Sequence, residues 1–308
     1  MFTLLAITHP VLIIDEAQDL NADRVRILSA LATRVEVLAA ADEFQCLDPN
    51  IRPNPAMEWL AAVGQVINLT EPRRTNIADL LDAAAALRAG KPPVSQDKFK
   101  IVLASNSPLA GTWASHAIAW YAKEKTVAVI SPSYKGYAQH VVEWSSTKKT
   151  NKGIGPINIR WEKAESAEIG DLVEQLQLPD EIGYFDLVEL VRAKANGRVA
   201  TDVKSWADVQ RRALGRQVFS RDEVIESIIQ SFSSQKRLKS SVDKSRCALT
   251  VHGAKNREFD QVIVLWPAGV VGDDDQRRRL LYNAVTRARE RCLVLVQASK
   301  ALQLPPFV

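Results

Sequence analysis

Short, uninterrupted apolar runs alternate with segments of helical spacing along most of this chain, and this alternation constrains the fold more than any other feature. Residues 11–14 (Val-Leu-Ile-Ile), 127–130 (Val-Ala-Val-Ile) and 262–265 (Val-Ile-Val-Leu) are apolar throughout. Strands of this kind are buried on both faces, as in parallel sheets covered by helices. Since helical patterns lie between the runs, the sequence predicts an α/β fold built on parallel sheets.

The alternation is interrupted between residues 146 and 245, where a polar stretch leads to a predicted short strand at 157–161 and then to mostly helical patterns. Another strand is predicted at 66–69. We therefore expect one parallel-sheet domain formed by residues 71–145 and 246–308, with residues 146–245 as a mainly helical insertion.

The composition is that of a folded protein without membrane-spanning segments. Hydrophobic residues make up 46% and charged residues 25% of the 308 residues, as in globular proteins. No apolar run approaches the roughly 20 residues of a transmembrane helix, and the start lacks the basic leader and cleavage site of a signal peptide. Cys46, Cys247 and Cys292 lie far apart without metal-ligand spacing. We therefore expect reduced thiols, a cytoplasmic location and no membrane partner.

The net charge of +4 does not by itself predict a nucleic-acid-binding protein. Local basic clusters are more informative, and they lie at residues 148–152, 211–216, 236–239 and 277–279. Any one such cluster can equally be an ordinary solvated face.

An acidic pair ends the first apolar run. Asp15 and Glu16 lie within residues 12–19 (Leu-Ile-Ile-Asp-Glu-Ala-Gln-Asp). In nucleotide hydrolysis one carboxylate at such a position holds Mg²⁺, and the next positions and deprotonates the attacking water. Two acids also occur at the ends of ordinary strands, so this motif alone leaves both interpretations open.

Four further motifs follow, and with residues 12–19 they resemble motifs II to VI of the UvrD/Rep-type superfamily 1 DNA helicases. They are residues 40–45 (Ala-Ala-Asp-Glu-Phe-Gln), 69–75 (Leu-Thr-Glu-Pro-Arg-Arg-Thr), 249–260 (Leu-Thr-Val-His-Gly-Ala-Lys-Asn-Arg-Glu-Phe-Asp) and 279–289 (Arg-Leu-Leu-Tyr-Asn-Ala-Val-Thr-Arg-Ala-Arg). Each alone would be an ordinary loop, turn or basic helix. Five motifs in family order over nearly the whole chain favour the resemblance.

The resemblance implies that ATP and Mg²⁺ bind between two RecA-like domains. On one wall, Asp15 would hold Mg²⁺ and the nucleotide, Glu16 would be the catalytic base, and Gln45 would sense the γ-phosphate. The family usually has glycine where Ala41 stands in this chain.

On the opposite wall, the resemblance implies that Arg74 and Glu258 reach the nucleotide and that Arg287 is the catalytic arginine finger. Arginine suits phosphate binding because its planar fork donates two hydrogen bonds to phosphate oxygens. Arg73 replaces the family tyrosine that stacks on adenine, so this position lacks the aromatic ring.

Single-stranded DNA is the partner that the resemblance implies. Thr250, His252 and Lys255 match the part of motif V that contacts DNA. Asn256 stands where the family has glycine, and asparagine tolerates left-handed backbone angles, so we expect the loop to keep its shape.

The sequence contains no Gly-x-x-x-x-Gly-Lys-Ser/Thr phosphate loop, which in the family precedes motif II. We therefore expect residues 1–70 to be the C-terminal remnant of a first RecA-like domain, with an N-terminal helicase fragment as a possible partner. The expected function is that of an ATP-dependent 3′–5′ DNA helicase or translocase in repair or recombination, inactive as this chain alone. The alternative is a DNA-binding or regulatory remnant that hydrolyses nothing.

Overall fold

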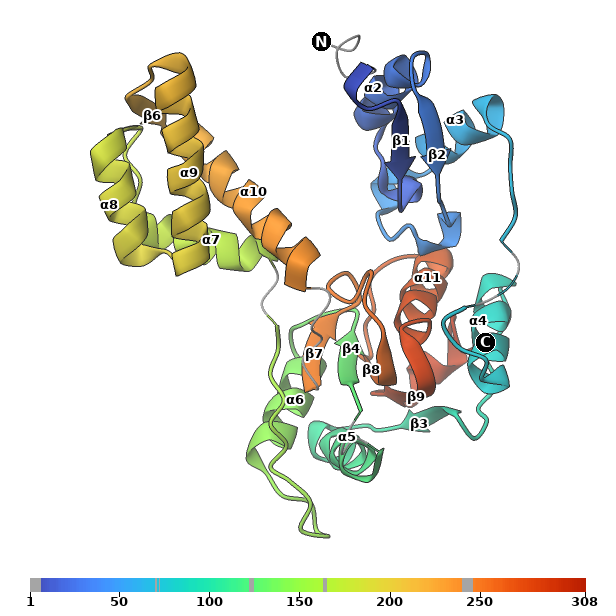
Figure 1. The fold of residues 1–308 in the computed structure, drawn as a ribbon. Helices are drawn as coiled ribbons and strands as arrows, with labels where there is room; N and C mark the ends of the chain where they lie inside the picture. Colours follow the sequence, from blue (N-terminus) through green and yellow to red (C-terminus); the bar gives the residue numbers. More distant parts are fainter. Residues whose placement is uncertain (1–6, 70, 72, 122–124, 163–164, 240–245) are drawn as a thin grey trace. The chain divides into compact units, whose positions relative to one another are not determined.

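The chain forms two compact units in a computed structural model that describes residues 7–69, 71, 73–121, 125–162, 165–239 and 246–308. One unit comprises Met1–Arg160 and Ser245–Val308, and the other comprises Trp161–Lys244. The strands and α-helices, labelled in Figure 1, are β1 (Val11–Ile14), α2 (Ala22–Ala32), β2 (Glu36–Ala39), α3 (Pro55–Val63), α4 (Ala78–Arg88), β3 (Phe99–Leu103), α5 (Ser107–Tyr121), β4 (Val127–Ser131), α6 (Tyr137–Thr147), α7 (Glu165–Leu176), β5 (Glu181–Gly183), α8 (Tyr184–Lys194), α9 (Gly197–Leu214), β6 (Val218–Ser220), α10 (Arg221–Lys239), β7 (Arg246–Thr250), β8 (Phe259–Trp266), α11 (Asp274–Val285) and β9 (Ala288–Val296).

A five-stranded parallel sheet of order β3-β9-β8-β4-β7 forms the centre of the larger unit. Every residue of β4 is buried, and so is nearly every residue of β8, because helices cover both faces of a parallel sheet. The α/β class and the parallel sheet predicted from the sequence are therefore confirmed.

The two faces of this sheet carry different helix pairs (Figure 1). Leu87 of α4 and Leu281 of α11 are fully buried in one core with Val264 and Val294 of the sheet. On the other face α5 packs against α6, and Gly111 permits this approach. A side chain at this position would come within 2.3 Å of the Trp144 ring.

The N-terminal part of the larger unit contains a two-stranded parallel sheet of β1 and β2, in which Ile13 pairs with Leu38. Ile13 is 74% exposed and Leu38 is 54% exposed, so one apolar side of this small sheet faces solvent. The strand predicted at residues 66–69 is wrong. The described residues 65–69 have no regular structure and no strand partner, and Leu69 is 90% exposed.

The smaller unit is mainly helical, with α7 to α10 around a core of its own and a short antiparallel pair, β5 and β6. The sequence placed the start of the insertion at residue 146, whereas residues 146–160 lie in the larger unit. They are held there by backbone hydrogen bonds from Ile157 to Ser145 and from Ala248 to Arg160. The predicted strand at 157–161 is an extended segment with only a single bridge residue at its end.

Candidate functional site

The acidic pair lies directly after β1, as the sequence predicts. Glu16 adopts a left-handed backbone conformation with φ of 55°, which is uncommon for a residue with a side chain and is among the strained conformations that cluster at active sites. Its N–H donates to Asp15 Oδ1 at 3.0 Å. Asp15 is exposed and Glu16 is half-buried, so the turn presents two carboxylates at the carboxyl end of the strand.

Gln18, which sequence reasoning did not single out, holds this turn in place. Its side chain is fully buried, donates to Glu16 Oε2 and accepts from the backbone N–H of Asp42 at 2.9 Å. The Asn54 amide donates to the backbone oxygen of Gln18 at 2.8 Å. Motifs II and III are thereby joined through one buried amide.

Gln45 lies between the N-terminal segment and the five-stranded sheet. Its amide nitrogen donates to Asp42 Oδ2 at 3.0 Å, and its amide oxygen accepts from Arg287 Nη2 at 3.2 Å. The two residues are 242 positions apart in sequence. The structure therefore brings the predicted γ-phosphate sensor and the predicted arginine finger into direct contact.

Arg287 is 2% exposed and lies in the connection between α11 and β9. The helical spacing of the sequence continues to residue 288, but α11 ends at Val285 because β9 begins at Ala288, where it pairs with Phe259. Burial, and to a smaller extent the positive charge of Arg74, lower the pKa of the Arg287 guanidinium to about 10. Glu16 and other acidic groups would raise this pKa, but their effect is smaller. Among the described residues, no carboxylate lies within ion-pair distance of it.

A second arginine, Arg74, lies next to this position. Its Nε is 2.6 Å from Glu258 Oε1, and its Nη1 donates to the backbone oxygen of Thr286 at 2.8 Å. Arg289 contacts the other oxygen of Glu258 at 3.0 Å. Burial would raise the pKa of Glu258, but hydrogen bonds from the two arginines outweigh it and lower the pKa. Motifs IV, V and VI are thus joined by one carboxylate. Thr70 and Pro72 of motif IV lie outside the described residues.

Arg88 at the end of α4 is a further member of the site that the sequence did not reveal. It forms an ion pair with Asp42 and donates to the Tyr282 hydroxyl, and its guanidinium lies 4.9 Å from the centroid of the Tyr282 ring. Burial would raise the pKa of Asp42, but hydrogen bonds from Arg88 and Gln45 outweigh it and lower the pKa. The motif III loop is therefore attached to both helices on this face of the sheet.

The loop after β7 contains the residues predicted to contact DNA. The Thr250 hydroxyl accepts from the Gly253 N–H at 3.1 Å and so caps the turn. Asn256 has φ of 60°, which confirms that asparagine takes the left-handed conformation expected at this position. The loop keeps a tight turn without the family glycine.

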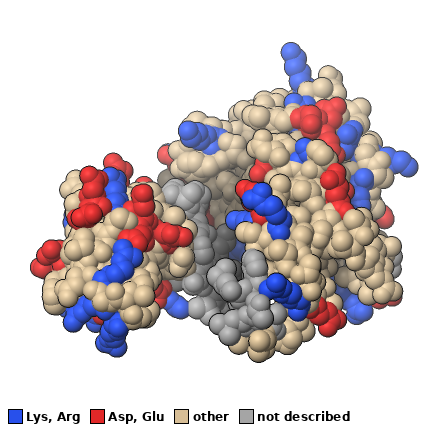
Figure 2. All heavy atoms as spheres, turned by 90° about the horizontal axis from the view of Figure 1, so that it is seen from above, with Lys and Arg blue, Asp and Glu red and all other residues tan. Residues whose placement is uncertain are grey.

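Lys255 and His252 line a pocket of about 620 Å³ at the carboxyl ends of β4, β7 and β8. Lys255 Nζ contacts both oxygens of Asp19, at 2.6 and 2.8 Å, so motif V is joined to motif II. Burial and the nearby Lys255 lower the pKa of His252. The negative charges of Asp19 and Asp48 would raise this pKa, but they do not reverse the shift. His252 is therefore neutral at pH 7. On the face in Figure 2, basic and acidic side chains are interspersed.

Asp15 suits a magnesium ion whose other ligands are substrate phosphates and water. Among the described residues, no group of three or more His, Cys, Asp or Glu side chains could hold a metal ion. Mg²⁺ commonly binds through one or two carboxylates together with substrate phosphates and water, and an exposed carboxylate fits that arrangement. Arg74 and Arg287 are the nearby cations that suit phosphate oxygens.

Two of three comparisons relate the chain to known proteins. Residues 246–295 match the UvrD-like helicase C-terminal domain family. A solved structure, the C-terminal domain of a possible DNA helicase from Lactobacillus plantarum WCFS1, is 14% identical with a TM-score of 0.33, over 77% of this chain and 92% of that chain. No curated protein sequence matches. In the part of the chain that the structure describes, no helix is long and apolar enough to span a membrane.

Proposed function

Because residues 246–295 carry a UvrD-like helicase C-terminal domain, we propose that this chain is the C-terminal portion of an ATP-dependent DNA helicase and contributes to its ATP site and its DNA track. The observation that carries the proposal is the contact of Arg287 with Gln45. It joins the phosphate-sensing loop to the α11–β9 connection, next to the acidic turn at Glu16.

In this proposal Asp15 holds the Mg²⁺ of Mg·ATP, and Arg74 and Arg287 bind the phosphate oxygens. Mg²⁺ supplies charge neutralisation of the phosphates when bound. Glu16 is the group that accepts a proton from the attacking water. Arg287 is already desolvated, so its charge acts in a low-dielectric position, where electrostatic stabilisation of a phosphoryl-transfer transition state is strongest.

Single-stranded DNA is the proposed nucleic-acid partner, and Lys255 and His252 are the residues proposed to contact the DNA backbone. The family resemblance favours 3′–5′ movement, a cytoplasmic location and a role in repair or recombination. A second candidate is a DNA-binding or regulatory protein without hydrolysis, and one observation favours it. The 308 residues contain no Gly-x-x-x-x-Gly-Lys-Ser/Thr phosphate loop, and side chains cannot replace its ring of backbone N–H groups.

Nucleotide binding is tested by titrating the chain with a fluorescent ATP analogue and Mg²⁺. Arg74→Ala should weaken binding at least tenfold, because it removes a charged fork from the phosphates. Arg73→Ala is the matched control. Arg73 is the adjacent arginine, its side chain is 90% exposed, and it forms an ion pair with Glu71 at 3.5 Å. Equal effects of the two substitutions, or no binding at millimolar nucleotide, would refute the ATP site.

Hydrolysis separates the two candidates. We expect this chain to bind Mg·ATP and single-stranded DNA with a turnover far below 1 s⁻¹, the low end of typical enzyme rates. Turnover at or above that rate, stimulated by DNA and abolished by Glu16→Gln, would mean that these residues form a complete hydrolytic site. Nucleotide binding without turnover in any complex that restores the phosphate loop would favour the regulatory protein.

A further inference from the structure

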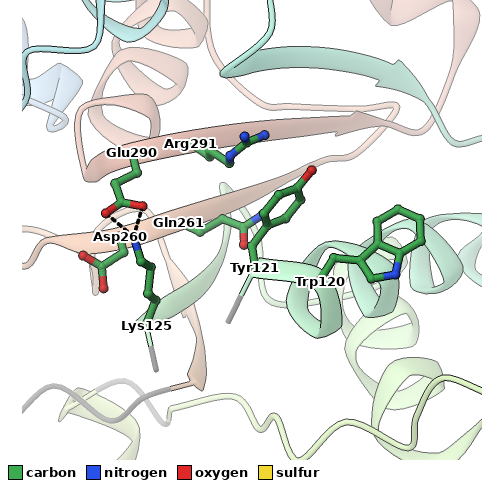
Figure 3. Close-up of a pocket in the computed structure, with 7 residues that line it drawn as sticks. All are labelled: Trp120, Tyr121, Lys125, Asp260, Gln261, Glu290 and Arg291. Atoms are coloured by element: carbon green, nitrogen blue, oxygen red, sulfur yellow. Dashed lines mark hydrogen bonds and ion pairs between the residues drawn. The ribbon is translucent and has the colours of Figure 1, made fainter. Parts of the chain in front are cut away.

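A second pocket, of about 190 Å³, lies at the amino-terminal ends of β8 and β9 beside the last turn of α5 (Figure 3). None of its described lining residues belongs to the ATP or DNA contacts proposed above. The volume is below the roughly 300–1,000 Å³ of pockets for drug-sized ligands. It therefore suits a single ring system rather than a whole cofactor.

Gln261 supplies a polar group that is directed into this pocket. It is 5% exposed and is the Cα partner of Arg291 on β9 and of Val127 on β4. Its Oε1 has no hydrogen-bond partner among the described residues, and its side chain extends towards Tyr121 (Figure 3). Buried side-chain acceptors without a donor are rare in folded proteins. After a rotation of the Gln261 amide towards the pocket, an N–H group of a ligand would supply the missing donor for this oxygen.

Two aromatic rings from α5 line the same pocket. Trp120 is 59% exposed and packs on His116, with ring centroids 4.9 Å apart. Tyr121 is 42% exposed, and the centroid of its ring lies 4.2 Å from the guanidinium carbon of Arg291. Each ring has a neighbour that fixes its orientation while a large part of its surface remains open. Rings of this kind are platforms on which planar bases stack.

The carboxylates of the pocket are occupied by neighbours. Glu290 is paired with Lys125. Asp260 Oδ2 accepts from the Thr126 N–H at 2.8 Å and from its hydroxyl at 2.9 Å. These acids therefore have internal partners and do not require a metal or a cationic ligand.

A basic loop lies beside the aromatic rings. Lys152 Nζ is 5.8 Å from the centroid of the Trp120 ring, and the exposed residues 148–149 are lysines of the same loop. Thr150, which is buried, contacts His116 Nε2 at 3.3 Å and so ties the loop to α5. The loop thus places positive charge next to a stacking surface, where the phosphates of a strand would lie.

We propose that this pocket binds one unpaired base of a single-stranded nucleic acid, with stacking on Trp120 or Tyr121, an N–H donated to Gln261 Oε1 and phosphates beside Lys152. The aromatic–basic combination favours nucleic acid over a peptide. The proposed contacts lie at the opposite end of the strands from the His252–Lys255 loop, and the proposal does not depend on the ATP site.

The test measures the affinity of a labelled eight-nucleotide single strand for the whole chain by fluorescence anisotropy. Trp120→Ala should weaken binding about tenfold, since stacking of one base on an aromatic side chain has an effect of this size. Trp113→Ala is the matched control, because Trp113 lies on the same helix, is 41% exposed and does not line the pocket. It should change the affinity less than twofold. Gln261→Leu, similar in size, should weaken binding severalfold.

Two further measurements locate the contact. A strand carrying 4-thiothymidine should crosslink to Trp120 or Tyr121, and a strand of abasic sites should bind no better to the native chain than to Trp120→Ala. Equal affinities of the Trp120 and Trp113 variants, or no crosslink at the α5 end, would overturn the proposal. If only Lys255→Ala weakens binding, the α5 pocket is refuted while the DNA track stands. Binding of aromatic peptides but not of oligonucleotides would make it a peptide site and refute it as well.

Discussion

Replacing Arg287 with methionine should leave the protein at least as stable as before, although the residue is 2% exposed. The pKa of Arg287 falls to about 10, from about 12.5 or more for an exposed arginine. This difference corresponds to a cost of about 3 kcal/mol for keeping the charge in the folded state at pH 7. Methionine is unbranched and of similar length, and it carries no charge.

The hydrogen bonds of Arg287 offset part of this cost. It donates to the backbone oxygen of Asn283 and to Gln45 Oε1, each at 3.2 Å, and to Thr286 Oγ1 at 3.4 Å. A hydrogen bond contributes about 1 kcal/mol net, and more when a charged group takes part. The sum for Arg287→Met therefore lies between zero and about 1 kcal/mol of stabilisation. Buried charges replaced by apolar residues show the same trend.

Thermal unfolding followed by circular dichroism at pH 7.5 measures this balance. At roughly 2–4 °C per kcal/mol for a unit of this size, Tm should stay constant or rise by a few degrees. The charge penalty is fully present below pH 10 and is lost only as pH rises through the folded pKa, so pH 7 and pH 9 should give the same difference. Leu281→Ala, in a fully buried position of α11, is the control and should lose about 2–5 kcal/mol. A fall in Tm of more than about 4 °C for Arg287→Met would refute the reasoning.

Three other predictions concern function. In any complex that hydrolyses ATP, Arg287→Ala should lower turnover by about 10³ or more with DNA binding nearly intact, as for other arginine fingers; a change below tenfold would remove it from the site. Binding of single-stranded DNA should weaken steeply with salt, and Lys255→Ala should reduce the slope of log K against log salt by about 1; an unchanged slope would exclude a phosphate contact. Because the pKa of His252 is lowered, His252→Ala should leave that slope unchanged at pH 7.5, and a difference between variant and native chain should appear only at pH values below the ordinary imidazole pKa of about 6.5; a difference at pH 7.5 would contradict a neutral imidazole.

Strands of the central sheet could be predicted because their sequence property is local. A run such as residues 262–265 is apolar on every side chain, and a strand covered on both faces buries all of them. Residues 66–69 (Val-Ile-Asn-Leu) include an apolar pair but have no neighbouring strand. A strand needs a partner for its backbone groups, and a window of four residues contains no information about that partner.

The end of α11 shows the same limit next to Arg287, a residue of the proposed site. Residues 286–289 continue the helical spacing of polar and apolar residues, and the sequence alone favours a longer helix. The helix ends because Ala288 pairs with Phe259 of β8, and the Phe259 N–H donates to the Arg287 oxygen at 2.9 Å. This pairing places Arg287 in a connection whose backbone is fixed by the sheet.

The site was predictable as a set of motif residues but not as a network. Arg74 and Glu258 meet in the structure, and both were expected at the nucleotide. Arg88, by contrast, ends an alanine-rich helix that has no motif, and its contacts with Asp42 and Tyr282 depend on how α4 packs against α11. No signal within the sequence of that helix could have identified it.

The link between Lys255 and Asp19 shows why the network matters for a helicase-like site. Asp19 closes the acidic motif that begins at Asp15, and Lys255 belongs to the loop expected to contact DNA. An ammonium group has three donors, and the two oxygens of Asp19 take two of them, so a phosphate that binds Lys255 also meets the negative charge of Asp19. In the proposed function, DNA and the acidic motif would therefore act on the same side chain. A phosphate bound at Lys255 would weaken its hold on the turn that carries Glu16, and this contact between two side chains would couple ATP chemistry to DNA binding without a change of fold.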